Sequence, residues 1–149
     1  MEDKELHFVG RVAQKALIEH DGKILVCKGV GDEVWEFPGR RLHTGESPQE
    51  GMIREIKEEL QLIVRIVRPL YTCLSWHAKA GVHNFFVAYL CAVEGAADIV
   101  SNDEVVEKKW ITKEELKALP MFDDCRGAVE EYLAAQQSKQ SHPTSDAHI

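Results

Sequence analysis

Three glutamates on one predicted helix are the residues of this sequence whose spacing is best suited to chemistry. Glu55, Glu58 and Glu59 stand at positions i, i+3 and i+4, so on a helix they share one face. Like charges at this spacing destabilise a helix unless a cation offsets their repulsion. Carboxylate oxygens are ligands that hard divalent ions such as Mg²⁺ or Mn²⁺ prefer. The spacing therefore fits a metal site, and it equally fits a solvated acidic face balanced by Arg54 and Lys57.

The element that would position these glutamates has a clear start signal. Ser47 is a good N-cap residue, Pro48 suits the first helical position, and Glu50 completes the spacing of a capping box. We therefore predict a helix from Pro48 to about Leu60. Its apolar residues fall on a neighbouring face, which we expect to be buried, and they are Met52, Ile53, Ile56 and Leu60.

Composition limits the class of protein. The chain has 149 residues, of which 44% are apolar and 29% charged, as is typical of one soluble globular domain. The formal net charge of −7 argues against binding a nucleic acid polymer, because phosphate backbones are held by clustered Lys and Arg. A small phosphorylated ligand stays compatible with an acidic protein, since metal ions screen the charge.

Cysteine usage and hydropathy predict a cytoplasmic location. The four cysteines lack the close spacing of a zinc or redox pair, and Cys27, Cys73 and Cys91 lie in apolar stretches where we expect buried free thiols. The sequence leaves the burial of Cys125 open. No apolar run approaches the roughly 20 residues of a membrane span, and residues 1–5 lack the apolar core of a signal peptide. We expect no membrane partner, and a monomer or homodimer.

The order of elements predicts an α/β/α sandwich with a mixed sheet. The predicted strands span residues 9–19, 24–28, 62–67, 70–76, 82–93 and 105–111, with Asp21-Gly22 as a hairpin turn and Pro69 as a strand end. Thr112 with Glu115 forms a capping box before a short helix, and a closing helix spans 124–136. Strands interrupted by one helix and followed by two more suggest this fold for a single domain, 1–136. From residue 137 the polar composition predicts a disordered tail, 137–149.

The stretch around the glutamates resembles the Nudix box. Its pattern is Gly, five residues, Glu, seven residues, then Arg-Glu-apolar-any-Glu-Glu-any-Gly-apolar. Here Glu46 is followed by seven residues and then by Arg-Glu-Ile-Lys-Glu-Glu-Leu-Gln-Leu at 54–62. The preceding Trp-Glu-Phe-Pro-Gly at 35–39 is similar to the lead-in of MutT-type members. The resemblance covers about a sixth of the chain, and it implies the same α/β/α fold.

Two positions depart from the box, because Arg40 and Gln61 stand where the pattern has glycine. Glycine at such sites permits positive φ or close backbone approach. Gln61 falls where a helix ends in a left-handed residue, which costs about 1 kcal/mol for a residue with a side chain. Arg40 has two interpretations: it strains the loop, or it offers its guanidinium to a substrate phosphate.

The resemblance implies hydrolysis of a nucleoside diphosphate linked to another group. By position in the motif, Glu55, Glu58 and Glu59 would be the metal carboxylates, and a backbone carbonyl ligand from the loop would be that of Gly39. The implied cofactor is Mg²⁺ or Mn²⁺.

Arg54 would then orient Glu46 or neighbouring carboxylates through a bidentate pair. The alternative for Arg54 is an ordinary i, i+4 ion pair with Glu58.

The general base has two candidates, Glu59 and Glu104, and Glu104 also reads as an ordinary solvated loop acid. MutT-type proteins often place purine contacts near the last helix. Phe122 could stack on a base there, and Asp123 or Asp124 could bind its edge. Alternatively, Asp123 caps the helix.

Three functions compete. The first is a MutT-type pyrophosphatase acting on a (d)NTP, with oxidised nucleotides among the candidates. The second is hydrolysis of ADP-ribose or a nucleotide sugar, which no separate sequence element supports. The third is a catalytically weak nucleotide-binding module, supported only by the departures at Arg40 and Gln61.

Overall fold

The computed structural model describes residues 6–29, 31–98 and 106–141. Within them, one mixed sheet has the strand order β3-β4-β1-β2-β5. The strands are β1 (Arg11–His20), β2 (Lys23–Gly29), β3 (Val64–His77), β4 (Val82–Val93) and β5 (Val106–Thr112). The helices are α1 (Pro48–Leu60), α2 (Lys113–Ala118) and α3 (Asp123–Ser141).

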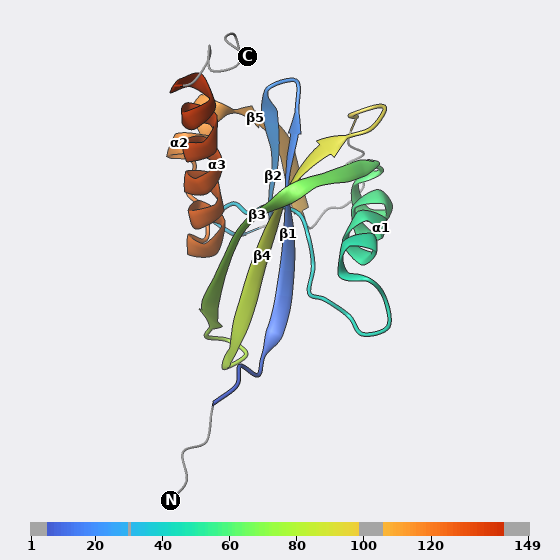
Figure 1. Ribbon diagram of the computed structural model, residues 1–149, viewed down its shortest axis with the longest axis vertical. Helices are drawn as coiled ribbons and strands as arrows, with labels where there is room; N and C mark the ends of the chain where they lie inside the picture. Colours follow the sequence, from blue (N-terminus) through green and yellow to red (C-terminus); the bar gives the residue numbers. More distant parts are fainter. Residues whose placement is uncertain (1–5, 30, 99–105, 142–149) are drawn as a thin grey trace, which may run out of the picture.

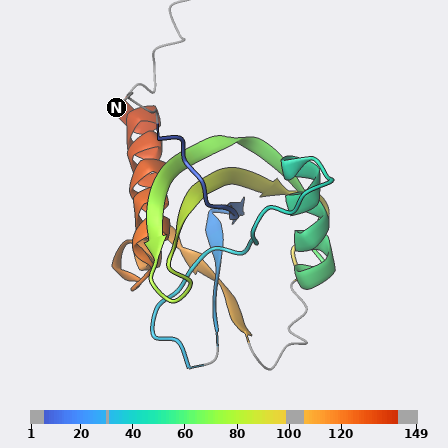
Figure 2. The same ribbon diagram turned by 90° about the horizontal axis from the view of Figure 1, so that it is seen from below.

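The helices cover opposite faces of the sheet. Helix α1 lies on one face, and α2 and α3 lie on the other (Figures 1 and 2). Strands β1 and β4 are parallel, whereas the β1–β2, β2–β5 and β3–β4 pairs are antiparallel. The predicted α/β/α sandwich with a mixed sheet is confirmed.

Two apolar clusters form the core, one on each face of the sheet. Successive residues of β1 alternate between them, since Ile18 packs in the α1 cluster and Leu17 in the α3 cluster. The predicted inner face of α1 is confirmed at Met52, Ile56 and Leu60, which are buried. No helix among the described residues is both long and apolar enough to cross a membrane.

The loop that precedes α1 lies where β1 and β2 no longer pair with each other. The two strands pair at Glu19–Ile24 and His20–Lys23, next to their hairpin turn. Farther along, residues 38–42 take the free edge of β1 through three backbone hydrogen bonds of 2.7 to 2.9 Å. We call residues 38–46 the box loop. Its first half is therefore held as an extra extended segment against the sheet.

Two predicted boundaries are wrong. Pro69 does not end a strand, because β3 runs through it from Val64 to His77 with register shifts on both sides of Pro69. Strand β3 is at the sheet edge, where proline and bulges are tolerated. Helix α3 continues to Ser141, so residues 137–141 are helical rather than part of a tail. Residues 142–149 lie outside the described residues.

One predicted helix cap is confirmed and one is wrong. Thr112 and Glu115 form the reciprocal capping box at the start of α2. Ser47 has the extended backbone of an N-cap residue, but its side chain makes no capping hydrogen bond, so the box predicted with Glu50 is absent.

All four cysteines are free thiols. Cys91 and Cys125 are buried, whereas Cys27 and Cys73 are only partly buried, which corrects the expectation for those two. Burial raises the pKa of Cys27, Cys91 and Cys125 to about 12.

Candidate active site

Gly39 marks the point where the box loop passes closest to β1. Its φ of +147° lies in the region that favours glycine, and a Cβ there would come within 2.0 Å of the carbonyl oxygen of Gln14. Any side chain would therefore push the loop off the sheet. The carbonyl oxygen of Gly39 accepts a hydrogen bond from Lys15 Nζ at 3.4 Å. This carbonyl, which the resemblance assigns to the metal, thus already faces a cationic group.

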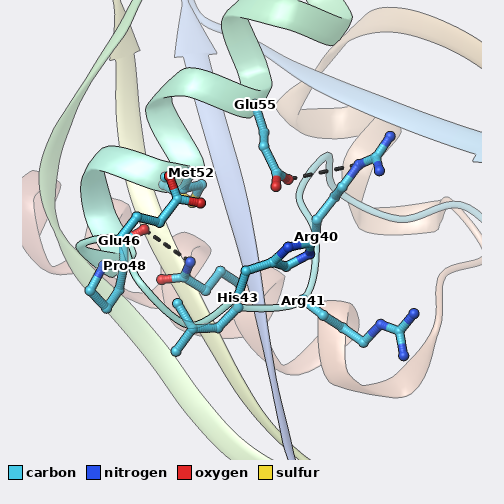
Figure 3. Close-up of a pocket in the computed structure, with 10 residues that line it drawn as sticks. Arg40, Arg41, His43, Glu46, Pro48, Met52 and Glu55 are labelled. Carbon is cyan, nitrogen blue, oxygen red and sulfur yellow. Dashed lines mark hydrogen bonds and ion pairs between the residues drawn. The ribbon is translucent and has the colours of Figure 1, made fainter.

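Gln14 fixes the start of α1 relative to the sheet. It is a buried polar residue, and its Nε2 donates to the carbonyl oxygen of Pro48 at 3.0 Å (Figure 3). Because α1 also buries its apolar face, this bond and the core together set the orientation of the helix. The glutamate face of α1 is consequently turned toward the box loop.

Arg40 lies among the glutamates of α1. Its Nε contacts the carboxylate of Glu59 directly. The same Nε lies 3.7 Å from Oε2 of Glu55 (Figure 3). Among the described residues, Asp21 and Gln61 are the non-glycine residues with positive φ, so Arg40 is not in a strained backbone conformation. The interpretation that Arg40 strains the loop is wrong. Its guanidinium instead pairs with two of the predicted metal carboxylates.

Arg54 satisfies both of its predicted interactions at once. Its Nε and Nη2 donate to the two carboxylate oxygens of Glu46 at 3.2 and 2.9 Å, and its Nη1 pairs with Glu58. The hydrogen bonds from Arg54 hold the pKa of Glu46 below its usual value. The same bonds raise the pKa of Arg54. Arg54 therefore ties the box loop to α1.

An ion pair that the sequence analysis missed stands beside Gly39. Lys15 Nζ lies 2.7 Å from Oε1 of Glu36. Burial alone would lower the pKa of Lys15, but the attraction and hydrogen bond of Glu36 outweigh it and the pKa is raised. The available signal was a lysine directly before the apolar run Ala16-Leu17-Ile18, in a strand expected to be buried.

An open cavity of about 570 Å³ joins the box loop to the start of α3. Gly39 and Arg40 line it on one side, and Phe122 and Asp124 on the other. The predicted phosphate-binding residue Arg40 thus shares one cavity with Phe122 and Asp124, two of the predicted base-binding residues, although about 80 positions separate them in the chain.

Two further residues of this cavity escaped the sequence analysis. Arg11 and Asn84 are register partners in the parallel β1–β4 pair and both line the cavity. Within the described part of the chain, the buried Arg11 Nε and Asn84 Oδ1 have no hydrogen-bond partner. Buried polar atoms are rarely left unpaired, so these two are candidates for ligand contacts. No local pattern could have revealed them, because only strand register makes them neighbours.

The aspartates at the start of α3 differ in their surroundings. Asp124 Oδ1 accepts a hydrogen bond from the backbone N–H of Cys125 at 2.7 Å. Asp123 is the first residue of α3, and its side chain accepts no hydrogen bond from any described residue, so the predicted capping role is not found. Asp123 lines a second cavity, along β3, rather than the one shared with Arg40. Glu104, the other base candidate, lies outside the described residues.

The donor set of α1 suits a hard divalent ion. Glu55, Glu58 and Glu59 supply carboxylate oxygens, and each already faces a cationic side chain. Across residues 6–29, 31–98 and 106–141, no three acidic, imidazole or thiol groups converge as a ready-made metal cluster. The reason is visible in the pairing, since Glu58 turns to Arg54 and Glu59 turns to Arg40.

Comparison with known proteins shows the family to which the chain belongs. Residues 11–132 match the family described as the NUDIX domain. The chain is 33% identical over 114 residues to nucleoside triphosphatase NudI of Salmonella typhimurium, covering 67% of this chain and 80% of NudI. It is 32% identical over 60 residues to an RNA pyrophosphohydrolase of Acinetobacter baylyi, covering 40% of this chain but only 36% of that protein.

A solved structure also matches. The crystal structure of a MutT Nudix hydrolase from Burkholderia pseudomallei superposes with a TM-score of 0.69 at 27% identity, covering 81% of this chain and 96% of that chain. The family match spans most of the described residues, including the box loop, α1 and the start of α3. The chain therefore belongs to the Nudix hydrolase family.

Proposed function

We propose that the protein hydrolyses nucleoside triphosphates, ribo- or deoxyribo-, to a nucleoside monophosphate and pyrophosphate with Mg²⁺ or Mn²⁺. The observation that carries this proposal is the single cavity lined by Gly39 and Arg40 at one end and by Phe122 and Asp124 at the other. A nucleotide has charged phosphates at one end and an aromatic base at the other, and the cavity is divided in the same way. The similarity to NudI, a nucleoside triphosphatase, supports the same proposal.

Charge at the cavity supports a phosphate-bearing substrate. The protein has a net charge of −7, yet this cavity gathers basic side chains against two acidic ones, Glu36 and Asp124. Basic groups bind phosphate oxygens through charge-assisted hydrogen bonds. The basic residues that line the cavity are Arg11, Lys15, Arg40 and Arg41.

The divalent ion would be held by carboxylates of α1 and by a loop carbonyl. In this proposal Glu55, Glu58 and Glu59 supply the carboxylates, and Gly39 supplies the carbonyl oxygen. When bound, the ion neutralises developing negative charge and lowers the pKa of water.

Arg54 keeps Glu58 in place through its bonds to Glu46. The proton of the attacking water would pass to a carboxylate, for which Glu59 and Glu104 remain the candidates.

The base would bind at the α3 end of the cavity. Phe122 is 44% exposed and is available to stack on a purine or pyrimidine. Asp124 could accept a hydrogen bond from a base amine, and the unpaired Oδ1 of Asn84 offers a second acceptor. Asp123 lines the neighbouring cavity, so we expect it to contribute less than Asp124.

A nucleotide panel tests the proposal. Products should be separated by anion-exchange chromatography after incubation with Mg²⁺ and ordinary or oxidised (d)NTPs, ADP-ribose or a UDP-sugar. A triphosphate gives a nucleoside monophosphate and pyrophosphate, ADP-ribose gives AMP and ribose 5-phosphate, and a UDP-sugar gives UMP and a sugar 1-phosphate. We expect pyrophosphate from at least one triphosphate, and Asp124→Asn should change the ranking of purine over pyrimidine substrates. Lys57→Gln, an exposed change elsewhere on α1, should leave the ranking as it is.

Other outcomes would replace the proposal. Turnover of ADP-ribose or the UDP-sugar without any triphosphate would establish the second function considered above. Nucleotide binding without turnover of any compound would establish a binding module.

A further inference from the structure

We propose that Arg40 is a built-in counter-ion of the metal carboxylates, which a divalent cation must displace before it can bind. The inference rests on the proposed metal site. It concerns Arg40, which stands where the Nudix box pattern has glycine. A glycine has no side chain to place among the carboxylates, so this competition is a property of this chain.

The contacts of Arg40 lead to this inference. Its Nε is shared between Glu59, in direct contact, and Glu55, at 3.7 Å. The Glu55 side chain is only 16% exposed, while that of Arg40 is 59% exposed. The guanidinium is therefore the more exposed partner in both contacts, and an ion that binds these carboxylates must compete with it.

The side chain of Arg40 can move away from Glu55 and Glu59 without a rearrangement of the box loop. Its carbonyl oxygen accepts the backbone N–H of Gln14 at 2.9 Å, which holds the main chain on β1. Its backbone is unstrained and its side chain is mostly exposed. Displacement consequently needs only a change of side-chain rotamer, which is fast for an exposed residue.

Electrostatics makes the two cations exclude one another. In the proposed site a divalent ion and the guanidinium would both pair with the carboxylate of Glu59, and two positive charges a few ångströms apart repel. Binding of the ion then carries the free-energy cost of breaking the Arg40 pairs. The freed guanidinium would remain beside the cavity that we assign to the phosphates.

Arg41 provides a matched control. It is the next residue of the same loop, carries the same charge and lines the same cavity. It forms no ion pair with the described residues, and its side chain points away from Glu55 (Figure 3). Arg41→Gln therefore removes an equal charge nearby without removing a contact to the carboxylates.

Mn²⁺ titration of the nucleotide-free protein by calorimetry or electron paramagnetic resonance tests the inference. We expect Arg40→Gln to bind Mn²⁺ about 3- to 10-fold more tightly than the parent, the range of a partly exposed ion pair made with two carboxylates. Arg41→Gln should gain less than about 2-fold, because only a screened, longer-range repulsion is lost. Arg40→Gly should show the same gain as Arg40→Gln, which guards against an effect of the new side chain.

Thermal melting supplies a second readout. Saturating Mn²⁺ should raise the melting temperature of Arg40→Gln more than that of the parent, relative to each protein in EDTA. An Mn²⁺ affinity that is unchanged, weaker, or no better than that of Arg41→Gln would overturn the counter-ion inference. If the parent binds Mn²⁺ no better than Glu58→Gln, the metal assignment of the proposed function fails as well.

Discussion

Single arginines decide how the carboxylates of the box lie. Arg54 holds Glu46 and Glu58, and Arg40 holds Glu59 and approaches Glu55. The repulsion expected from three glutamates on one helix face is therefore offset within the protein. The helix therefore needs no metal ion to form.

Removing one carboxylate of α1 tests its proposed catalytic role. We expect Glu58→Gln and Glu59→Gln each to lower kcat by about 100-fold or more, since groups that merely orient a metal ligand already contribute roughly 10–100-fold. Either change also breaks an arginine pair, so neither should stabilise the metal-free protein, contrary to what repulsion alone predicts. Steady-state kinetics and circular-dichroism melting would measure both effects. Unchanged turnover in both variants would contradict the assignment.

The pair between Arg54 and Glu46 predicts a pH dependence. We expect Arg54→Gln to raise the pKa of Glu46 toward its ordinary value of 4.5, because the hydrogen bonds that favour the carboxylate are lost. In the parent the folded pKa is below the unfolded one, so the pair contributes stability above pH 4.5 and loses it as the pH falls through the folded pKa.

NMR titration of the Glu46 carboxyl carbon would measure the shift. The difference in the free energy of unfolding between the parent and Arg54→Gln should become smaller as the pH is lowered. A gap that widens toward low pH would contradict the assigned sign.

At the scale of elements, α1 ends as the sequence predicts. Gln61 follows its last residue with φ +56° and ψ +32°, in the left-handed conformation. Its Nε2 donates to the carbonyl oxygen of Glu58 at 2.9 Å, which partly offsets the cost of that conformation. The end of the helix, and with it the position of the last two glutamates, therefore depends on a non-glycine residue.

Substitutions at Gln61 separate the contribution of its side-chain hydrogen bond from the cost of its left-handed backbone conformation. Gln61→Ala loses the side-chain hydrogen bond but keeps the unfavourable φ, so it should lower the free energy of unfolding by about 0.5–1.5 kcal/mol. Gln61→Gly loses the same bond but relieves the backbone, and it should be about 1 kcal/mol more stable than Gln61→Ala. Urea denaturation measures both differences. Equal stability of the two variants would mean that the left-handed backbone costs nothing here.

At the scale of the whole molecule, α3 brings the base end of the cavity to the box loop. The helix packs across β3, and Gly127 lies against the side chain of Tyr71 in that strand. A Cβ on Gly127 would come within 2.4 Å of the Tyr71 hydroxyl oxygen. Asp124, in the first turn of the same helix, and Phe122, which comes just before that helix, both line the cavity.

Gly127→Ala tests that packing. Inside a helix, alanine is normally favoured over glycine by up to about 1 kcal/mol. Here we expect the opposite sign, a loss of about 1–3 kcal/mol from overpacking against the Tyr71 ring. Urea denaturation gives the free energy of unfolding. Adding Tyr71→Phe, which removes the nearest atom, should recover part of the loss, whereas the exposed control Glu130→Ala should stay within about 0.5 kcal/mol of the parent.

The sequence by itself determined the elements whose causes are local. The bounds of α1, the bounds of β4 at residues 82–93 and the left-handed end at Gln61 all followed from caps, apolar periodicity and backbone preference within a few residues. The Nudix box likewise depends on spacing along one helix, so its glutamates could be singled out without coordinates. Their roles in catalysis stay predictions.

Only the tertiary structure decided which distant groups meet. Three pairs of neighbouring residues come from segments that are 19 to 73 residues apart in the chain. They are Arg40 with Glu59, Lys15 with Glu36, and Arg11 with Asn84. Strand register and the path of the box loop along β1 set these contacts, and neither leaves a local signal. The same non-local support let β3 continue through Pro69, because an edge strand needs fewer backbone donors. The polar composition from residue 137 also did not predict where α3 ends, since the helix runs to Ser141.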